Sequence, residues 1–291
     1  MNIACVCLLV AMATFAKASS PEEGDMFEGD MILSPDQMAA LQEQNRKKNS
    51  FASIKASHWK DKNGKPDVIK FYVDNAISKA RGVILEAVAE YQKHTCIRFQ
   101  ELGYRPTNEP HLYFATGRGC SSPVGRWRSG NRISLATGCW TKGIVMHEMG
   151  HSLGFYHEQS RPDRDNYVYI HLENINPGSR FNFNKYTTDT IDSLGTPYDY
   201  ESLMHYGKKY FTTDWNKLTI QTHDPTMQDK IGQRKGFSKG DIIQLNKMYC
   251  NGSGTGSSSC QDTDNGCKDW KSFCSYDPYT IKHCKKTCGK C

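Results

Sequence analysis

The chain has 291 residues, 37 Lys and Arg against 31 Asp and Glu, and a formal net charge of +6 at pH 7. This length allows one sizeable domain plus an appendage. The basic residues are interspersed with acidic ones, which is typical of an ordinary solvated surface and argues against a nucleic-acid partner.

The first 48 residues predict two segments outside the globular domain. Ile3 to Ala16 form an apolar run too short to span a bilayer, and Ala16-Lys17-Ala18 is typical of a signal-peptide cleavage site. Residues 1–18 are therefore predicted to be a secretory signal peptide, which makes the protein secreted and extracellular. Residues 19–48 are acidic first and end in the basic cluster Arg46-Lys47-Lys48, a candidate processing site. No later segment predicts a membrane span.

The cysteine count agrees with secretion. The chain has twelve cysteines, and Cys5 and Cys7 lie in the predicted signal peptide. Ten remain after its removal. An even number of cysteines in a secreted chain predicts disulfide bonds that form in an oxidising compartment.

From about Asn49 the composition and apolar patterning are typical of a globular domain, which is predicted to extend to residue 250. Val68 to Val73 is apolar and β-branched, which predicts a strand. Asp74 is placed to cap the helix that follows. The apolar residues of that helix keep helical spacing, which predicts a face that covers a sheet; they are Ile77, Ala80, Ile84, Ala87 or Val88, and Tyr91.

Two short strands and two more helices are predicted further along. His111 to Ala115 and Ile133 to Leu135 read as strands, and Gly143 to Leu153 reads as a helix. Ser238 followed by Asp241 resembles a capping box that opens a last helix. The predicted buried side of this helix consists of Ile242, Leu245 and Tyr249.

The carboxyl-terminal part predicts a linker and a small disulfide-rich unit. Residues 251–259 are rich in Gly and Ser, which is typical of a flexible linker, and Asn251 begins an N-x-S sequon, a candidate glycosylation site. Residues 260–291 contain six cysteines and form a segment too small for a normal core, so three disulfides are expected to stabilise it. Six cysteines allow 15 pairings, and spacing alone does not choose among them.

One run that begins in the second predicted helix, Gly143 to Leu153, indicates metal chemistry. It reads H-E-x-x-H-x-x-G-x-x-H. His147 and His151 lie four residues apart, so both rings leave the same face of a helix and can reach one metal ion. Gly154 can turn the chain at the helix end and bring His157 back as a third ligand. Three protein ligands leave a fourth position for water, which is typical of a catalytic zinc site.

Glu148 follows the first of these ligands and can face the open position of the metal without binding it. The alternative interpretation is a helix with unrelated histidines. H-E-x-x-H alone arises by chance in roughly one chain in a hundred of this size, but a glycine and a third histidine at fixed offsets argue against chance. The other histidines considered are interpreted as structural or surface residues: His94, His111, His205 and His223.

Together with motifs downstream, this run resembles the signature of the astacin metalloproteases. The resemblance rests on the run from Gly143 to Asp165 and on Ser202-Leu203-Met204-His205-Tyr206, which resembles that family's Met-turn. It covers about residues 27–250. It implies an α+β fold of the metzincin type, with two lobes, a twisted and mostly parallel sheet, helices, and an irregular lower lobe.

The resemblance also assigns roles. Glu148 is implied to be the general base, and Met204 an apolar floor beneath the metal. Tyr206 is implied to be a fifth zinc ligand in the substrate-free enzyme, which swings away when substrate binds and then donates a hydrogen bond to the oxyanion. The implied ligands for one zinc ion per chain are His147, His151 and His157.

The family's prosegment motif F-x-G-D is matched by Phe27-Glu28-Gly29-Asp30. The resemblance implies that Asp30 takes the open zinc position in the zymogen, and a carboxylate oxygen is a suitable ligand. The alternative is a random acidic residue in a disordered tail. An activating protease is expected to cut at or near Lys48–Asn49. The new amino terminus is then expected to pair, through water, with Glu158.

The resemblance extends to the disulfides. Matched by position, the catalytic domain is expected to contain Cys96–Cys250 and Cys120–Cys139. The tail resembles the ShK (SXC) module of sea anemone toxins and secreted invertebrate proteins, on the run from Cys284 to Cys291. That module implies the pairs Cys260–Cys291, Cys267–Cys284 and Cys274–Cys288.

Potassium-channel blockers of the ShK type use a Lys-Tyr pair, and Pro278-Tyr279 stands at the apparent equivalent here. Because the lysine is missing, an adhesive or targeting role is favoured over channel block. The partner of this module stays unknown from the sequence.

The expected function is that of a secreted zinc endopeptidase made as a zymogen. It would hydrolyse protein or peptide substrates with zinc-activated water and Glu148 as general base. An extended substrate is expected to pair with the edge of the sheet, for which His111 to Ala115 is the predicted strand. The alternative is a catalytically silent secreted binding protein, or a toxin, that acts through the ShK module. The complete set of zinc residues favours the enzyme.

Overall fold

The computed structural model describes residues 28–46, 57–188 and 190–250, and near the carboxyl terminus residues 262, 264, 266–268, 270–274, 280 and 283–288. Several predictions concern residues outside these ranges. They are the signal peptide, Phe27, the cut at Lys48–Asn49, Asn251 with the linker, the disulfide Cys260–Cys291, and Pro278-Tyr279.

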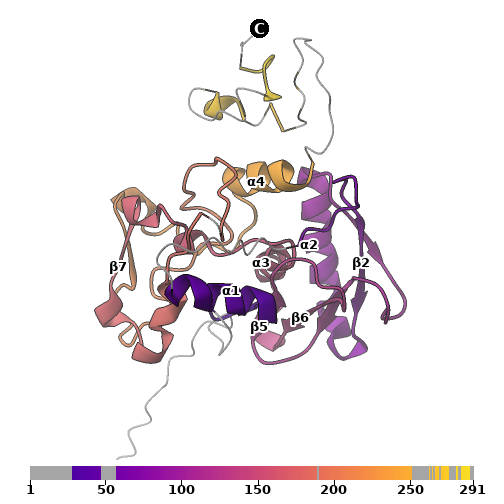
Figure 1. Cartoon of the computed structure of the whole chain (residues 1–291), viewed down its shortest axis with the longest axis horizontal. Helices are drawn as coiled ribbons and strands as arrows, with labels where there is room; N and C mark the ends of the chain where they lie inside the picture. The colour runs from indigo at the N-terminus through magenta and orange to yellow at the C-terminus, as the bar shows by residue number, and fades with distance from the viewer. Residues whose placement is uncertain are drawn as a thin grey trace, which may run out of the picture.

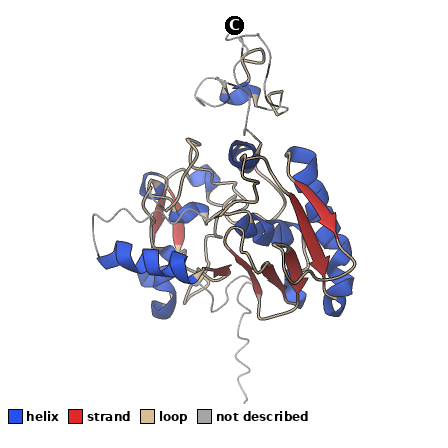
Figure 2. Ribbon diagram, turned by 45° about the vertical axis from the view of Figure 1, so that its right-hand side comes forward, coloured by secondary structure: helices blue, strands red, loops and turns tan. Residues whose placement is uncertain are grey.

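The larger lobe is built on a six-stranded sheet with the strand order β1-β5-β6-β4-β2-β3 (Figures 1 and 2). Only the β5–β6 pair is antiparallel within this sheet; the other neighbouring pairs are parallel. The sheet is therefore mostly parallel, as the resemblance implied. The strands are β1 (Met31–Ile32), β2 (Val68–Val73), β3 (Arg98–Glu101), β4 (Leu112–Ala115), β5 (Cys120–Pro123) and β6 (Asn131–Leu135).

The predicted edge strand is wrong. The strand β4 lies between β6 and β2, so its backbone is paired on both sides. Among the strands after residue 57, the two edge strands are β5 and β3. The strand β1 from the predicted prosegment pairs with β5 through Met31–Ser122 and Ile32–Pro123. Local sequence identifies a strand by its apolar side chains, but position within a sheet depends on strand order.

The helices are α1 (Pro35–Arg46), α2 (Arg81–His94), α3 (Lys142–Ser152) and α4 (Lys239–Tyr249). The helix predicted after Asp74 is divided into a 3-10 helix over Asn75–Ala80 and then α2. The Asp74 carboxylate accepts a hydrogen bond from the N–H of Ala76 at 2.8 Å, as a capping residue does.

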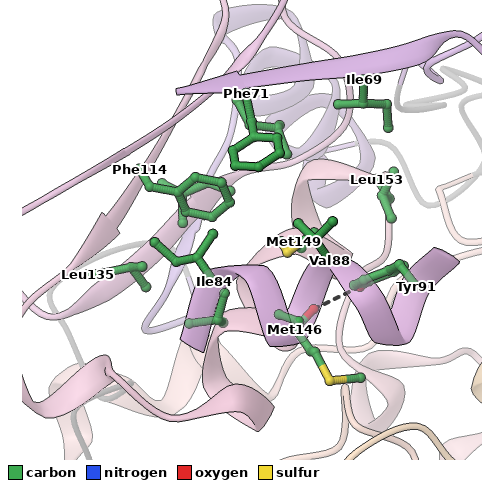
Figure 3. Close-up of a cluster of buried hydrophobic side chains, with 14 of the residues drawn as sticks. Ile69, Phe71, Ile84, Val88, Tyr91, Phe114, Leu135, Met146, Met149 and Leu153 are labelled. Atoms are coloured by element: carbon green, nitrogen blue, oxygen red, sulfur yellow. Dashed lines mark hydrogen bonds between the residues drawn. The ribbon is translucent and has the colours of Figure 1, made fainter. Parts of the chain in front are cut away.

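The main core lies between this sheet and the helices α2 and α3 (Figure 3). Phe71 of β2 and Phe114 of β4 pack edge to face at a centroid distance of 6.0 Å. Tyr91 of α2 is buried, and its hydroxyl donates to the carbonyl of Met146 in α3 at 2.8 Å. This contact holds α3 against α2. The buried face predicted for the earlier helix is confirmed at Ile77, Ala80, Ile84, Ala87, Val88 and Tyr91.

The smaller lobe contains little regular structure. A two-stranded antiparallel sheet of β7 (Val168–Ile170) and β8 (Ile220–Thr222) is flanked by short 3-10 turns. Aromatic side chains fill its core, among them Phe183, Tyr198 and Tyr206. Aromatic packing replaces regular elements as the source of stability here.

The capping box at the start of α4 is present. Ser238 Oγ accepts from the N–H of Asp241, and Asp241 Oδ2 accepts from the N–H of Ser238, both at 2.9 Å. Leu245 and Tyr249 are buried as predicted. Ile242 is only partly buried, and it packs with the carboxyl-terminal cluster of Trp270 and its neighbours, so the fully buried isoleucine of this turn is Ile243.

We expect Ser238→Ala to lower the free energy of unfolding by about 1 kcal/mol, because the helix loses its N-cap hydrogen bond. Denaturant unfolding of the purified protein measures this change. Ser78→Ala is the control, since Ser78 is an exposed serine in the 3-10 helix before α2. Equal stability of the two variants would contradict the role of the cap.

All four of the expected disulfides whose cysteines lie in the described residues are present: Cys96–Cys250, Cys120–Cys139, Cys267–Cys284 and Cys274–Cys288. The first joins the end of α2 to the end of α4, across 154 residues of chain. Among the described residues, no helix combines the length and the apolar character needed to cross a membrane.

Candidate metal centre

The helix α3 presents two histidines on one face and then ends in a tight turn. His147 and His151 are one turn apart in α3. Gly154 has φ of +103°, a conformation that residues with a Cβ rarely adopt. The N–H of Phe155 donates to the carbonyl of Gly150 at 3.1 Å, which closes the end of the helix. This turn brings His157 back toward the two helical histidines.

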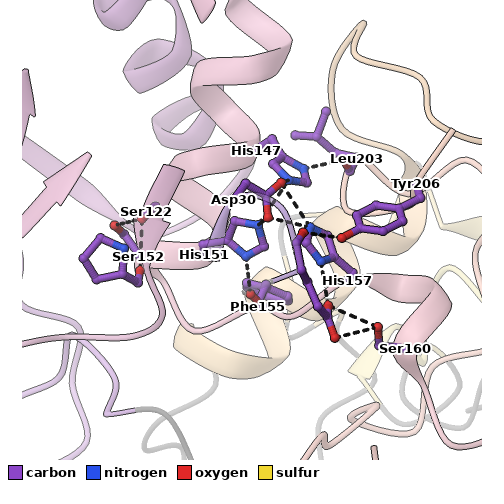
Figure 4. Close-up of polar contacts among 12 residues, drawn as sticks. Asp30, Ser122, His147, His151, Ser152, Phe155, His157, Ser160, Leu203 and Tyr206 are labelled. Atoms are coloured by element: carbon purple, nitrogen blue, oxygen red, sulfur yellow. Dashed lines mark hydrogen bonds and ion pairs between the residues drawn. The ribbon is translucent and has the colours of Figure 1, made fainter. Parts of the chain in front are cut away.

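The three histidines meet a carboxylate from the predicted prosegment. One ligand atom from each of four buried residues, Asp30, His147, His151 and His157, lies within 4.8 Å of the others. The Asp30 carboxylate lies 3.1 Å from His147 Nε2 and 3.2 Å from His157 Nε2 (Figure 4). The structure therefore assembles the predicted ligands and the predicted latch residue at one point.

Hydrogen bonds orient each imidazole. The Nδ1 atoms lie 2.8 Å from three acceptors, which are the carbonyl of Leu203 for His147, the carbonyl of Phe155 for His151, and the carboxylate of Glu28 for His157. Because these Nδ1 atoms carry the protons, the Nε2 lone pairs face inward. His147 Nε2 and His151 Nε2 are 3.1 Å apart. Two lone pairs at that distance repel each other unless both nitrogens bind the same cation. Nitrogen and carboxylate donors in this arrangement fit a zinc ion.

The electrostatics of the cluster also favour a cation. Burial lowers the pKa of His147 to about 4, so this imidazole is neutral. Burial also opposes a charge on His157, but the carboxylates of Asp30 and Glu28 outweigh it and raise the pKa of His157 to about 9. The same negative charges stabilise a metal ion in place of a proton. The pKa of Asp30 lies well below its usual value, because the histidines overcome the effect of burial, so Asp30 is ionised.

Glu148 lies in α3 directly after His147, and its side chain is fully buried. The predicted Met-turn packs against the same helix. Met204 lies against α3, where a Cβ on Gly150 would come within 2.9 Å of Met204 Sδ. The carbonyl of Met204 accepts from the N–H of Glu158 at 3.1 Å. The predicted floor residue is thus in contact with the helix that carries the ligands.

Tyr206 has a different partner from the one predicted for the substrate-free enzyme. Its hydroxyl donates to the backbone carbonyl of Glu28, and its ring packs on His157 at a centroid distance of 4.5 Å. This phenol therefore contacts the backbone of the predicted prosegment. Its role as a fifth ligand stays a prediction for the mature form.

Glu158 is buried beside the third histidine. Its Oε1 accepts from Arg161 Nη1 at 3.1 Å and from the N–H of Asp199 at 2.8 Å. Burial raises the pKa of Glu158 to about 8, although Arg161 opposes the shift. A cavity of about 170 Å³ adjoins this carboxyl and is also lined by His58, Gly154 and Arg161.

His205 is a structural residue, as the sequence indicated. Its Nε2 lies 2.7 Å from the hydroxyl of Tyr198, and its Nδ1 lies 2.8 Å from the carbonyl of Tyr206. Both nitrogens are therefore used within the smaller lobe.

Sequence reasoning missed a second set of polar residues beside the cluster. Glu28, Ser160 and Tyr186 form a buried hydrogen-bonded group with His157. Glu28 stands at the variable position of the F-x-G-D motif, and Tyr186 lies outside every motif. Only the folded chain brings these residues together.

Comparisons with known proteins agree with the geometry. The family model "Astacin (Peptidase family M12A)" matches residues 53–250, and the model "ShK domain-like" matches residues 259–291. Zinc metalloproteinase nas-30 of Caenorhabditis elegans is 41% identical over 234 residues, which is 78% of this chain and 30% of that protein. Protein SpAN of Strongylocentrotus purpuratus is 35% identical over 244 residues, 80% of this chain and 38% of that protein. The chain thus matches well under half the length of these relatives.

Among solved structures, High choriolytic enzyme 1, a hatching enzyme zinc-protease from Oryzias latipes, has a similar fold. The TM-score is 0.60 at 35% sequence identity, over 69% of this chain and 98% of that chain. The fold, the family model and the buried cluster of three histidines all lead to one assignment. The chain belongs to the astacin family, peptidase family M12A, and it carries a ShK domain-like segment at its carboxyl terminus.

Proposed function

We propose that this protein is a zinc-dependent endopeptidase that is secreted and made as a zymogen. The observation that carries the proposal is the convergence of four ligand atoms within 4.8 Å. The proposed layout is a signal peptide (1–18), a prosegment (19–48), the protease domain (49–250), a linker (251–259) and the ShK domain (260–291). The proposed proteolytic activity is supported by the names of similar proteins, which include a zinc metalloproteinase and a hatching enzyme zinc-protease.

The chemistry follows from the residues around the cluster. A zinc ion bound by the three histidines supplies a Lewis acid that polarises the substrate carbonyl and lowers the pKa of water. Glu148 accepts a proton from the attacking water and passes it to the leaving amine. Tyr206, once freed from Glu28, donates a hydrogen bond to the oxygen that gains negative charge. Substrates of this reaction are proteins or peptides.

Asp30 acts as the latch of the zymogen. Its carboxylate is buried and ionised among the three histidines, at the position where a substrate carbonyl must bind. The strand β1 follows directly and covers the edge of β5. An activating protease that cuts at or near Lys48–Asn49 separates the latch from the protease domain. Until then, the prosegment excludes substrate from the metal and from the sheet edge.

The cavity beside Glu158 supports the proposed fate of the new amino terminus. A buried carboxyl with a raised pKa is stabilised in its charged form when an ammonium group comes close. The cavity of about 170 Å³ has room for a terminal residue and water. We therefore assign Glu158 the role of anchoring the mature amino terminus.

The test is digestion of casein or gelatin by the processed protein. We expect cleavage that stops in a zinc chelator and returns when zinc is added, because the three histidines hold the ion on which the chemistry depends. Cleavage that persists in the chelator would refute the proposal. A protein that binds zinc but cleaves nothing would favour the alternative, a binding protein or toxin that acts through the ShK domain.

A further inference from the structure

The carboxyl-terminal ShK segment (residues 259–291) is held against the last helix of the protease domain. Ile243 of α4 is buried, although it lies about 160° around the helix from Leu245, which faces the main core. The cluster that buries Ile243 also contains Cys267, Trp270 and Cys284 of the ShK segment. The outer side of α4 is therefore covered by that segment (Figure 1).

A groove of about 700 Å³ runs between the protease domain and the ShK segment. The end of α2 and the residues after it contribute Lys93 and Arg98, and α4 contributes Lys239. The ShK segment contributes Asp264 and Trp270. None of the described residues that line the groove belongs to the metal cluster, so the groove is separate from the candidate metal centre.

The charge of the groove is positive. The charged residues that the protease domain contributes are two lysines and an arginine, and all three are exposed: Lys93, Arg98 and Lys239. Asp264 is the single acidic residue among the described lining residues. A surface with an excess of one charge raises the local concentration of partners that carry the opposite charge. The groove therefore favours an anionic partner.

Arg98 is fixed in a geometry that suits an oxyanion. Its Nη1 donates to the carbonyls of three residues at 3.2, 2.8 and 2.9 Å, which are Gln92, Thr95 and Ile97. One nitrogen thus anchors the guanidinium to the end of α2. The opposite edge, formed by Nε and Nη2, is suited to donate two parallel hydrogen bonds to two oxygens of one anion. A sulfate ester offers such a pair of oxygens together with a full negative charge.

The ShK segment places further cations beside the groove. Lys268 and Lys271 are exposed, and they flank Trp270, a lining residue, in the chain. The disulfide Cys267–Cys284, with a Cα–Cα distance of 5.2 Å, brings the exposed Lys285 close to Lys268. Because cations from both parts of the chain border one groove, a long polyanion fits it better than a single small anion.

A sulfated polysaccharide fits this surface better than an anionic membrane. Binding to a membrane surface normally combines basic residues with apolar side chains that insert among the lipids. Trp270, the largest apolar side chain beside the groove, is buried, and Phe273 is partly buried in the same cluster. A concave groove also suits a chain better than it suits a flat bilayer.

We propose that the groove between the protease domain and the ShK segment binds a sulfated polysaccharide, with Lys93, Arg98 and Lys239 on one side and Lys268 and Lys271 on the other. The bound polysaccharide holds the protein in an extracellular matrix through contacts away from the metal cluster. The choice of an extracellular polyanion rests on the proposed secretion, whereas the binding itself does not depend on proteolysis.

Binding to heparin, a heavily sulfated polysaccharide, tests the groove. Calorimetry compares the purified precursor with a groove variant that carries Lys93→Gln, Arg98→Gln and Lys239→Gln. We expect the groove variant to bind heparin at least about tenfold more weakly, and with a shallower dependence on salt, because contacts with sulfate groups are lost. A second variant with only Lys93→Gln and Lys239→Gln keeps the carbonyl contacts of Arg98 and should show a smaller loss.

A matched control separates the groove from net charge. It carries three substitutions that remove the same charge from exposed positions outside the groove, namely Lys62→Gln, Lys65→Gln and Lys79→Gln. This control should bind heparin as the wild type does. On the other side of the groove, Lys268→Gln together with Lys271→Gln should weaken binding at least about threefold.

Each outcome decides the proposal. Equal heparin affinity of the groove variant and its control, or full affinity in the variant of Lys268 and Lys271, would overturn it. Equal binding of chemically desulfated heparin, which keeps its carboxylates, would also overturn it. A precursor that binds phosphatidylserine vesicles but not heparin would point to a membrane instead. Casein cleavage by the processed groove variant should match the wild type, so failure of the groove and failure of the proposed proteolysis are distinguishable.

Discussion

Replacing Glu148 with Gln is expected to lower proteolysis by the processed protein by about 10³- to 10⁴-fold, because the reaction would lose its proposed general base. The residue is buried in α3 directly after a metal ligand, yet it does not belong to the set of ligand atoms that converge. Metal affinity should therefore change little. The measurement is kcat/KM on a quenched peptide, together with zinc content by mass spectrometry.

Glu86→Gln is the matched control for this experiment. Glu86 is an exposed residue of α2, so its loss should leave both turnover and zinc content unchanged. A Glu148→Gln protein that retains one zinc ion and also most of its activity would rule out this base. Loss of zinc from the variant would instead point to a role in the metal site.

The second large effect is expected in the uncut precursor. Asp30→Asn should raise its activity by at least about 100-fold, because an amide lacks the charge that pairs with the metal and the histidines. The activity is measured on a short peptide, with the precursor checked for the absence of cleavage. The charged partners of Asp30 in the structure are His147, His151 and His157.

Asp36→Asn provides the control, since Asp36 is an exposed carboxylate in α1 of the same prosegment. If the Asp30→Asn precursor binds zinc but is as inactive as the wild-type precursor, the proposed role of Asp30 as the latch is contradicted. Adding Glu28→Gln to Asp30→Asn should raise the activity further, because the side chain of Glu28 is the second buried anchor of the prosegment.

The zinc site was predictable because its geometry is local. His147 and His151 are brought to one face by helical spacing alone, and the turn to His157 depends on a single glycine, Gly154. The core face of α2 was predictable for the same reason. Each of these features depends on residues close together in the sequence, so a periodic pattern carries the information.

Features that depend on distant residues were not predictable. The strand β5 reads Cys-Ser-Ser-Pro, a sequence with low strand propensity, and its strand conformation is seen only in its pairing with the distant strands β6 and β1. The hydrogen-bonded group around Glu28 joins residues up to 158 positions apart. Glu28 stands at the variable position of the F-x-G-D motif, and nothing nearby in the sequence indicates that it is buried.

The pairing of β1 with β5 has a consequence for handling and storage of the protein. As long as β1 is in place, the N–H and C=O groups along that side of β5 are occupied. The proposed maturation would leave these groups unpaired, and an unpaired strand edge can pair with a strand from another copy as readily as with one from a substrate. Concentrated mature enzyme should therefore be prone to self-association and self-digestion, and the precursor is the form in which this chain can safely accumulate.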